Sequence, residues 1–216
     1  MIEPRIPVAR EGYPFIAFAT FLTLFTAVLG IDLLAWPLLL ITIFVLAFFR
    51  DPERMTDAAD NYLLSPADGK VIIIDEQFDD IFLQKKVIKV SIFMNVFNVH
   101  VNRIPTDGKV TEILYKPGEF YSADSVKAAL HNERCCVKMI TKNGSEIAFV
   151  QLAGLIARRI VNWLEPEDMV KRGNRYGLIR FGSRVDLYLP VDTEISVKIG
   201  QKVRAGQTPI ASLQRY

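Results

Sequence analysis

Residues 180–186, RFGSRVD, place a glycine–serine step between two apolar, strand-like runs. A further 33 residues follow Ser183, and their pattern is also that of β-structure. Because glycine has no Cβ, the Gly182 carbonyl can be approached closely, and the next residue supplies a hydroxyl. Gly-Ser is also a common turn dipeptide, so a simple turn and a reactive peptide bond both remain open.

The reactive interpretation gives this step a defined chemistry. If the flanking strands hold it under strain, the Ser183 hydroxyl can attack the Gly182 carbonyl and convert the amide to an ester. β-Elimination of that ester leaves dehydroalanine, which hydrolyses to ammonia and a pyruvoyl group. The chain would then make its own ketone cofactor from Ser183.

The charge near this step is basic, although the whole chain is nearly neutral. The net charge is +2 and the pI is near 8.5, which gives no global field that would favour nucleic acid. Residues 158–184 carry seven basic side chains against three acidic ones, a net charge of +4. This segment is either a solvated basic face or a surface that attracts an anionic head group or a membrane.

The cysteine and histidine content limits the cofactors to be expected. Cys135 and Cys136 are the only cysteines, and sequence neighbours rarely reach disulfide geometry, so a reducing, cytosolic-side compartment is favoured. No CxxC or HExxH spacing occurs, and the chain has two histidines. The sequence therefore predicts no metal site.

Two uncharged apolar runs lie near the N-terminus, at residues 15–29 and 33–49, with Gly-Ile-Asp between them. A helix needs about 20 apolar residues to cross the ~30 Å hydrocarbon layer, so runs of 15 and 17 residues are each marginal. Together they predict an apolar helical hairpin. Arginines flank both outer ends, which would place both ends in the cytoplasm if the hairpin crosses a bilayer.

A secretory signal peptide and a pair of buried core helices are the competing interpretations of these apolar runs. The signal peptide fits poorly, because the region is too long, is doubled, and lacks an A-x-A-like cleavage site before the turn. Buried core helices fit less well than lipid-facing ones, because neither run has a polar stripe. Full crossing and shallow insertion both remain open.

The chain after the hairpin is β-patterned. Residues 51–64 are polar and acidic and resemble a linker. We therefore expect a membrane-associated hairpin with the start of the linker at 1–54 and a catalytic β-rich domain at 55–216. Asp-Gly, Pro-Gly and Asn-Gly turns divide the domain into short strand-like runs, which favours a compact β-sandwich or barrel in a mainly β (α+β) fold. The runs are Val71–Ile74, Val87–Phe93, Val96–Val101, Val110–Leu114, Val137–Ile140, Ile147–Leu152, Leu155–Val161, Leu178–Phe181, Val185–Leu189 and Ile195–Val197.

Two details complete the fold prediction. Helical signals occur only at Ser122–Glu133 and at Pro166–Arg172, each of which suits one short helix. Residues 197–207 resemble the hairpin punctuation of biotinyl and lipoyl carrier barrels, but they lack the modified-lysine tip of those carriers. The likeness indicates a barrel-like fold, and the missing lysine tip argues against a swinging-arm function.

Three separated side chains supply a carboxylate, a base and a nucleophile. Asp68 lies at a tight turn before a strand, where an Asx turn accounts for it equally simply. His100 lies inside a strand-like apolar segment, where a structural histidine is also common. A serine hydroxyl is a poor nucleophile until a base takes its proton, and an imidazole oriented by a carboxylate does this in many folds. Together with Ser183 these residues form a candidate relay, although sequence spacing does not show that they meet.

Several motifs together carry a family resemblance. They are the apolar hairpin, FFRDPER at 48–54, SPADGKV at 65–71, FNVHVNRIP at 97–105, NER at 132–134 and RFGSRVD at 180–186. With these motifs the chain resembles the short, prokaryotic form of phosphatidylserine decarboxylase, a self-processing pyruvoyl enzyme, over nearly its whole length.

The resemblance implies cleavage between Gly182 and Ser183. It would give a β chain, 1–182, and an α chain, 183–216, which form a heterodimer, with Ser183 converted to the pyruvoyl group. Assembly of heterodimers into a higher oligomer stays open. Asp68 and His100 match the acid and the histidine that the family uses to activate that serine. Longer members carry a second histidine three positions later, where this chain has Arg103. Either His100 therefore serves both maturation and decarboxylation, or another group shares the work.

The implied reaction converts phosphatidylserine to phosphatidylethanolamine and carbon dioxide in phospholipid biosynthesis. The pyruvoyl ketone would form an imine with the serine amine and accept the electron pair released with carbon dioxide, and His100 is the best candidate proton donor. The enzyme would lie at the cell membrane, with the catalytic domain on the cytoplasmic side and the basic segment near the lipid phosphate. Two alternatives are a decarboxylase of archaetidylserine-type ether lipids and a non-catalytic, membrane-tethered β-barrel binding module.

Overall fold

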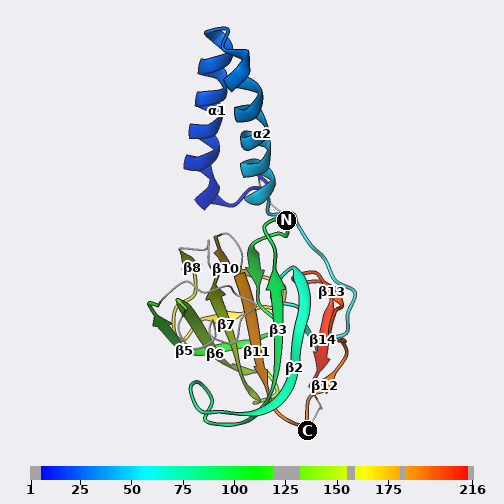
Figure 1. Ribbon diagram of the computed structural model, residues 1–216. Coiled ribbons are helices and arrows are strands. Elements are labelled where there is room, and N and C mark those ends of the chain that lie inside the picture. The colour runs from blue at the N-terminus through cyan, green and yellow to red at the C-terminus, as the bar shows by residue number, and fades with distance from the viewer. Residues whose placement is uncertain (1–5, 119–131, 155–158, 181–182, 214–216) are drawn as a thin grey trace. The chain divides into compact units, whose positions relative to one another are not determined.

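The computed structural model describes residues 6–118, 132–154, 159–180 and 183–213, which form a helix pair and a β-rich unit (Figure 1). The packing of the chain separates Met1–Glu53 from Arg54–Tyr216 as two compact units. The two units differ in secondary structure: the first consists of apolar helices, and the second consists of short strands.

The first unit is a helical hairpin, as the two apolar runs predict. A short 3-10 turn, η1 (Arg10–Gly12), leads into α1 (Tyr13–Val28), and α2 (Asp32–Phe48) follows the turn. Gly30 has a φ of +71° in that turn, a conformation that glycine adopts without steric cost. The Thr23 and Thr42 hydroxyls are hydrogen-bonded at 2.9 Å between the helices.

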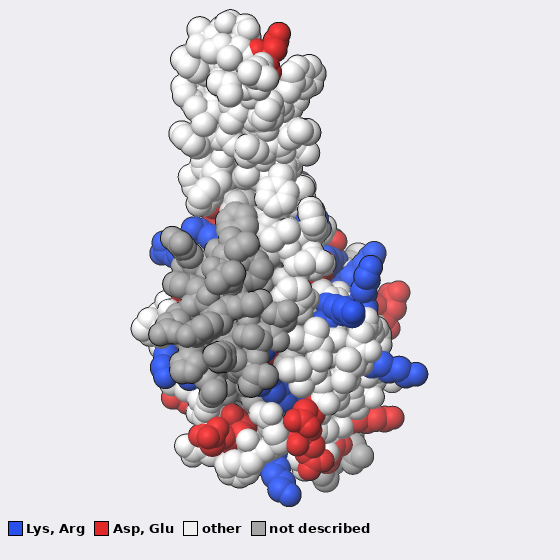
Figure 2. All heavy atoms as spheres, in the orientation of Figure 1, with Lys and Arg blue, Asp and Glu red and all other residues white. Residues whose placement is uncertain are grey.

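The surface of the hairpin is apolar. Side chains such as Leu33 and Trp36 are exposed, and Asp32 is the only charged residue between Tyr13 and Phe49. Figure 2 shows the helix pair as white, apart from an acidic side chain at its turn. Among the described helices, the stretch Arg10–Val28 is long and apolar enough to cross a membrane by itself, whereas α2 is shorter.

The β-rich unit contains one large antiparallel sheet and two small ones. The large sheet has eight strands in the order β13-β2-β3-β11-β7-β6-β5-β9, and Figure 1 shows that it is curled. The small sheets have the orders β1-β14-β12 and β4-β10-β8. The prediction of a mainly β fold is therefore confirmed. The strands are β1 (Tyr62–Leu64), β2 (Gly69–Asp79), β3 (Lys85–Met94), β4 (Val101–Arg103), β5 (Gly108–Lys116), β6 (Arg134–Thr141), β7 (Glu146–Ala153), β8 (Ile160–Asn162), β9 (Met169–Val170), β10 (Arg175–Ile179), β11 (Ser183–Leu189), β12 (Glu194–Ile195), β13 (Lys202–Val203) and β14 (Pro209–Ser212).

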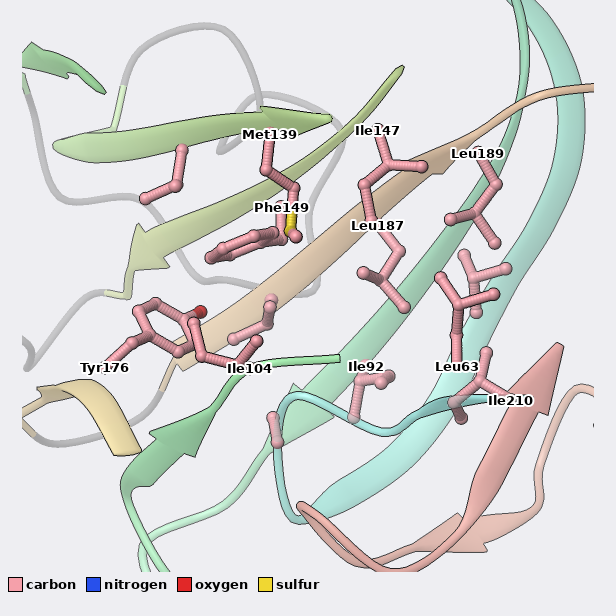
Figure 3. Packing of buried hydrophobic residues seen from close by; sticks show 14 of the residues in the cluster. Leu63, Ile92, Ile104, Met139, Ile147, Phe149, Tyr176, Leu187, Leu189 and Ile210 are labelled. Atoms are coloured by element: carbon pink, nitrogen blue, oxygen red, sulfur yellow. The ribbon is translucent and has the colours of Figure 1, made fainter. Parts of the chain in front are cut away.

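The main core lies on one face of the large sheet. Figure 3 shows Ile92, Phe149 and Leu187 projecting from neighbouring strands into one cluster, to which Leu63 and Ile210 of a small sheet also belong. Alternate residues of a strand point to opposite faces, so the apolar alternation in β11 places its odd-numbered side chains in this core. Ser183, the first residue of β11, is on the same side as Val185 and Leu187.

Two local predictions are corrected by the structure. Pro166–Arg172 is not a helix: a turn in which Glu167 has a φ of 78° leads into β9, which pairs with the start of β5. His100 does not lie inside a strand, because β4 begins one residue later. Pairing with β5 decided the first conformation, and local composition could not reveal that partner. In the second, the Asn95 and Asn98 side chains close a turn that ends the predicted strand run before β4. Nearly all of the predicted helix Ser122–Glu133 lies outside the described residues.

Candidate active site around Ser183

Ser183 lies at the start of the central strand β11. Its register partners are Met94, the last residue of β3, and Ala153, the last residue of β7. The residue is fully buried, and its hydroxyl donates to Met94 Sδ at 3.3 Å. A thioether sulfur is a weak acceptor, so this contact holds the hydroxyl only loosely. Gly182, the other half of the predicted cleavage site, lies outside the described residues.

Asp68 lies at the same end of the large sheet as Ser183, at the turn into β2. The next residue, Gly69, passes so close to β3 that a Cβ there would lie 2.1 Å from the Phe93 carbonyl oxygen, so the turn requires glycine. The Asp68 carboxylate accepts hydrogen bonds from both terminal nitrogens of Arg54 and, at 2.8 Å, from the Ala205 amide. This carboxylate is therefore fixed in place by a bidentate ion pair, whose side chains are 7% and 12% exposed.

His100 lies immediately before β4 and is buried. Its Nδ1 is 2.9 Å from the Asn98 carbonyl oxygen. Since a carbonyl can only accept, this contact assigns the proton of the neutral ring to Nδ1 and leaves Nε2 as the basic nitrogen. The His100 carbonyl in turn accepts from the Ile179 amide at 3.4 Å, which ties the residue to the strand that precedes Ser183 in sequence.

The three predicted residues gather at one end of the fold, but their side chains bond to different groups. β3 separates the starts of β2 and β11, so Asp68 and Ser183 are about two strand spacings, roughly 10 Å, apart. The hydrogen bonds described above join Asp68 to Arg54 and Ala205, His100 to Asn98, and Ser183 to Met94. The Asp–His–Ser relay therefore stays a prediction.

Sequence reasoning missed two polar groups that are linked to Ser183 through Met94. Asn102 donates from Nδ2 to Met94 Sδ at 3.7 Å, and Gln151 donates from Nε2 to Asn102 Oδ1 at 2.9 Å. Both carboxamides are fully buried. The available signal was a single amide side chain in each segment: Asn102 after VHV at 99–101, and Gln151 in the otherwise apolar run IAFVQLA at 147–153.

Several basic residues of the 158–184 segment have structural partners. Arg172 donates to the Ala58, Ala59 and Tyr62 carbonyls and pairs with Asp60. Arg184, on the opposite face of β11 from Ser183, forms a buried ion pair with Asp186. Arg159 is exposed and accepts a backbone hydrogen bond from Arg180 at 3.2 Å, just before β11. Arg159 and Arg180 are therefore joined to each other at the end of the described stretch that precedes β11.

Arg103, which stands where the family resemblance would allow a second histidine, is also part of the framework. It is buried, its backbone amide donates to the Pro66 carbonyl, and its guanidinium donates to the Gly173 carbonyl at 2.9 Å. These bonds connect the Asp68 turn to the loop before β10. They give Arg103 a structural role near the site.

The cysteines offer no reactive thiolate. Cys135 and Cys136 are buried and not joined in a disulfide. Burial raises the pKa of both thiols above the usual value. Within the described ranges, no three His, Cys, Asp or Glu side chains are grouped as metal ligands. Ser183 therefore supplies the buried hydroxyl around which the candidate site is built.

Comparison with known proteins identifies a family. The family model for phosphatidylserine decarboxylase matches residues 41–211. A phosphatidylserine decarboxylase proenzyme of Desulfotalea psychrophila is 57% identical over 99% of this chain and 100% of its own length. Proteins of the same name from Syntrophus aciditrophicus and Burkholderia multivorans are 52% and 45% identical, over 95% and 100% of this chain and 97% and 100% of their own lengths.

Proposed function

Because the chain belongs to the phosphatidylserine decarboxylase family, we propose that it matures by cutting its own Gly182–Ser183 bond and then works through a pyruvoyl group made from Ser183. The family makes it a carboxy-lyase that converts phosphatidylserine to phosphatidylethanolamine and carbon dioxide. The comparisons give no support to an ether-lipid enzyme or to a binding module. The observation that carries the proposal is the burial of Ser183 at the start of β11, where the only acceptor for its hydroxyl in the described part of the chain is a weak one.

The maturation step follows from bond changes at this serine. As the Oγ–H proton passes to a base, Oγ bonds to the Gly182 carbonyl carbon, the C–N bond breaks and the nitrogen takes up a proton, which leaves an ester. Elimination then releases the Gly182 carboxylate and leaves dehydroalanine, which reacts with water to give the pyruvoyl group and ammonia. We assign the base to His100, whose Nε2 is the unprotonated nitrogen, and the supporting charge to Asp68.

The surroundings of Ser183 fit a pyruvoyl group. The group is formed in place from the serine, so it needs no separate cavity, and the neighbouring side chains of Met94 and Ala153 are uncharged. When present, it supplies a ketone that binds the substrate amine and draws away the electron pair released with carbon dioxide. His100 then delivers the proton that replaces the lost carboxylate.

Cleavage would leave the two chains, 1–182 and 183–216, firmly paired. β11 is hydrogen-bonded along its length to β3 and β7, and β13 and β14 pair with β2 and β1. All of these pairings join the small chain to the large one. The mature enzyme is thus a heterodimer held by strand pairing and a shared core, with no new interface required.

The hairpin would keep the enzyme at the lipid surface. Its exposed apolar side chains favour membrane contact, and Arg10 and Arg50 at its two ends favour a cytoplasmic location for both. Arg159 and Arg180 support binding of the anionic lipid head group beside β11.

Intact-mass measurement of the purified protein tests this proposal. We expect two fragments of about 20 and about 4 kDa in place of one 24.5 kDa chain, with the small fragment blocked to N-terminal sequencing. Ser183→Ala should remain a single chain and release no carbon dioxide from phosphatidylserine vesicles. An unbroken wild-type chain that still decarboxylates the lipid would contradict the proposal.

A further inference from the structure

A buried amide group shares one sulfur atom with the nucleophile. Ser183 Oγ is 3.3 Å and Asn102 Nδ2 is 3.7 Å from Met94 Sδ. Because both atoms contact the same sulfur, Ser183 Oγ and Asn102 Nδ2 are at most 7.0 Å apart. All three residues are fully buried, so the amide lies beside the nucleophile in a region from which water is excluded.

Gln151 fixes the orientation of the Asn102 amide. It lies on β7 opposite Val185, so its side chain is on the same face of the sheet as Ser183. Its Nε2 donates to Asn102 Oδ1 at 2.9 Å, which leaves the Asn102 amide nitrogen directed toward the sulfur. Gly177 provides the space for this pair, since a Cβ there would lie 3.1 Å from Gln151 Nε2 and 2.2 Å from the Val161 carbonyl oxygen.

The pair is buried with unused hydrogen-bonding capacity. A carboxamide has two N–H donors, and a thioether at 3.7 Å satisfies one of them poorly. Gln151 Oε1 is buried and has no hydrogen-bond partner among the described residues. Buried polar groups are normally paired because an unmade hydrogen bond is costly. The Asn102 N–H groups, which lack a strong acceptor, can thus donate to a negative charge that forms only during the reaction.

We propose that the Asn102 amide stabilises the negative charge that forms during self-cleavage, and that Gln151 is the residue that positions it. The inference rests on the proposed maturation at Ser183. When Oγ bonds to the preceding carbonyl carbon, the C=O electron pair moves to the carbonyl oxygen. An N–H group of Asn102 donates to that oxygen until the C–N bond breaks and the pair returns. Because the donor is already oriented in a dry site, little reorganisation is needed.

The first test removes both amides while keeping the packing. In the double variant Asn102→Leu/Gln151→Met, apolar side chains of similar shape replace both partners, so the fold should be retained. We expect self-cleavage, followed as the loss of the 24.5 kDa chain, to slow by about 100-fold or more. The single variant Gln151→Met should slow it less, since Asn102 stays but is no longer fixed. Thermal unfolding verifies that each variant is folded.

Asn162 provides a matched control. It lies on β8, across Gly177 from Asn102 in the same small sheet, and it also donates its amide to a sulfur, Cys135 Sγ, at 3.4 Å. Asn162→Leu should cleave at the wild-type rate. If the control and the double variant slow equally, the effect is one of sheet packing and the proposal is overturned.

Hydroxylamine, which attacks esters, identifies the step. If Asn102 assists ester formation, hydroxylamine should leave the double variant uncut, as it does Ser183→Ala, while it cuts wild type. Rapid cutting of the variant would mean that the ester forms normally and would overturn the inference. A wild-type precursor that never cleaves would instead refute the proposed maturation, whereas wild-type cleavage with an equally fast double variant would refute the role of Asn102 alone.

Discussion

The two faces of β11 treat buried polar groups in opposite ways. On one face, Arg184 contacts Asp186 through Nε at 2.8 Å and a terminal nitrogen at 3.0 Å, and Lys89 lies 3.4 Å from the same carboxylate. On the other face, the neighbouring Ser183 hydroxyl has, among the described residues, only the thioether of Met94 as a partner. Charge-assisted bonds are much stronger than contacts to sulfur. One face thus braces the strand, and the other leaves the Ser183 hydroxyl weakly bonded, as the proposed self-cleavage requires.

This contrast predicts different kinds of mutational effect on the two faces. Changes on the braced face should lower the free energy of unfolding and affect cleavage only through folding. Changes to the polar groups on the reactive face should lower the rate of cleavage and leave the unfolding temperature nearly unchanged. Variants that mix the two effects would break the comparison.

The largest effect is expected at His100. His100→Gln removes the basic nitrogen Nε2 while keeping a side chain that can donate to the Asn98 carbonyl. General-base catalysis typically contributes 10²–10⁴-fold, so we expect cleavage to slow by about that factor with little change in unfolding temperature. The rate would be measured by gel densitometry of precursor and fragments. Added imidazole should partly restore cleavage in a smaller variant, His100→Gly, and cleavage of His100→Gln at the wild-type rate would remove the histidine from maturation.

Asp186→Ala tests the braced face. It leaves Arg184 and Lys89 without their shared carboxylate partner in a buried region, and removing one partner of a buried ion pair typically costs about 3–5 kcal/mol. We expect a correspondingly lower free energy of unfolding in urea titrations. To avoid a change of chain number, the measurement should use the uncleaved Ser183→Ala background. A stability equal to that of the parent would show that the ion pairs do not brace β11.

Arg54→Gln should have a smaller effect on stability. It leaves the Asp68 carboxylate with the Ala205 amide but without the bidentate guanidinium, and hydrogen bonds to charged groups contribute about 1.5–3 kcal/mol. The same urea titration measures the loss. Arg54→Lys keeps the charge but not the bidentate geometry, so it should recover only part of it. If Arg54→Gln also slows cleavage in the folded protein, Asp68 acts on the reactive face as well.

The sequence predicted the parts of this comparison that depend on local pattern. The apolar runs predicted the helical hairpin, and the apolar run after Gly182-Ser183 predicted the strand that begins at Ser183. It did not reveal Asn102, Gln151 or the Arg54–Asp68 pair, because those contacts join residues 14 to 49 positions apart. The turn at Glu167 was missed for the same reason: β9 exists only because β5 lies beside it. Long-range register, which a single sequence does not display, decided each of these features.

Met94→Leu should have the smallest effect and is the most direct test of the weakly bonded face. Leucine has a volume close to that of methionine, and such swaps usually cost less than about 1.5 kcal/mol. It removes the sulfur that both Ser183 and Asn102 contact. If the sulfur is only a weak acceptor that fills space, cleavage should stay within about threefold of wild type.

Met94→Ala is the companion variant, because it removes the packing as well as the sulfur. Its cavity should lower the free energy of unfolding by about 2–5 kcal/mol, which distinguishes an effect of packing from an effect of the sulfur. A loss of cleavage of 100-fold or more in a well-folded Met94→Leu protein would mean that the sulfur itself orients the hydroxyl. The Ser183 hydroxyl would then be fixed by a specific contact, as Arg184 is by Asp186 on the other face.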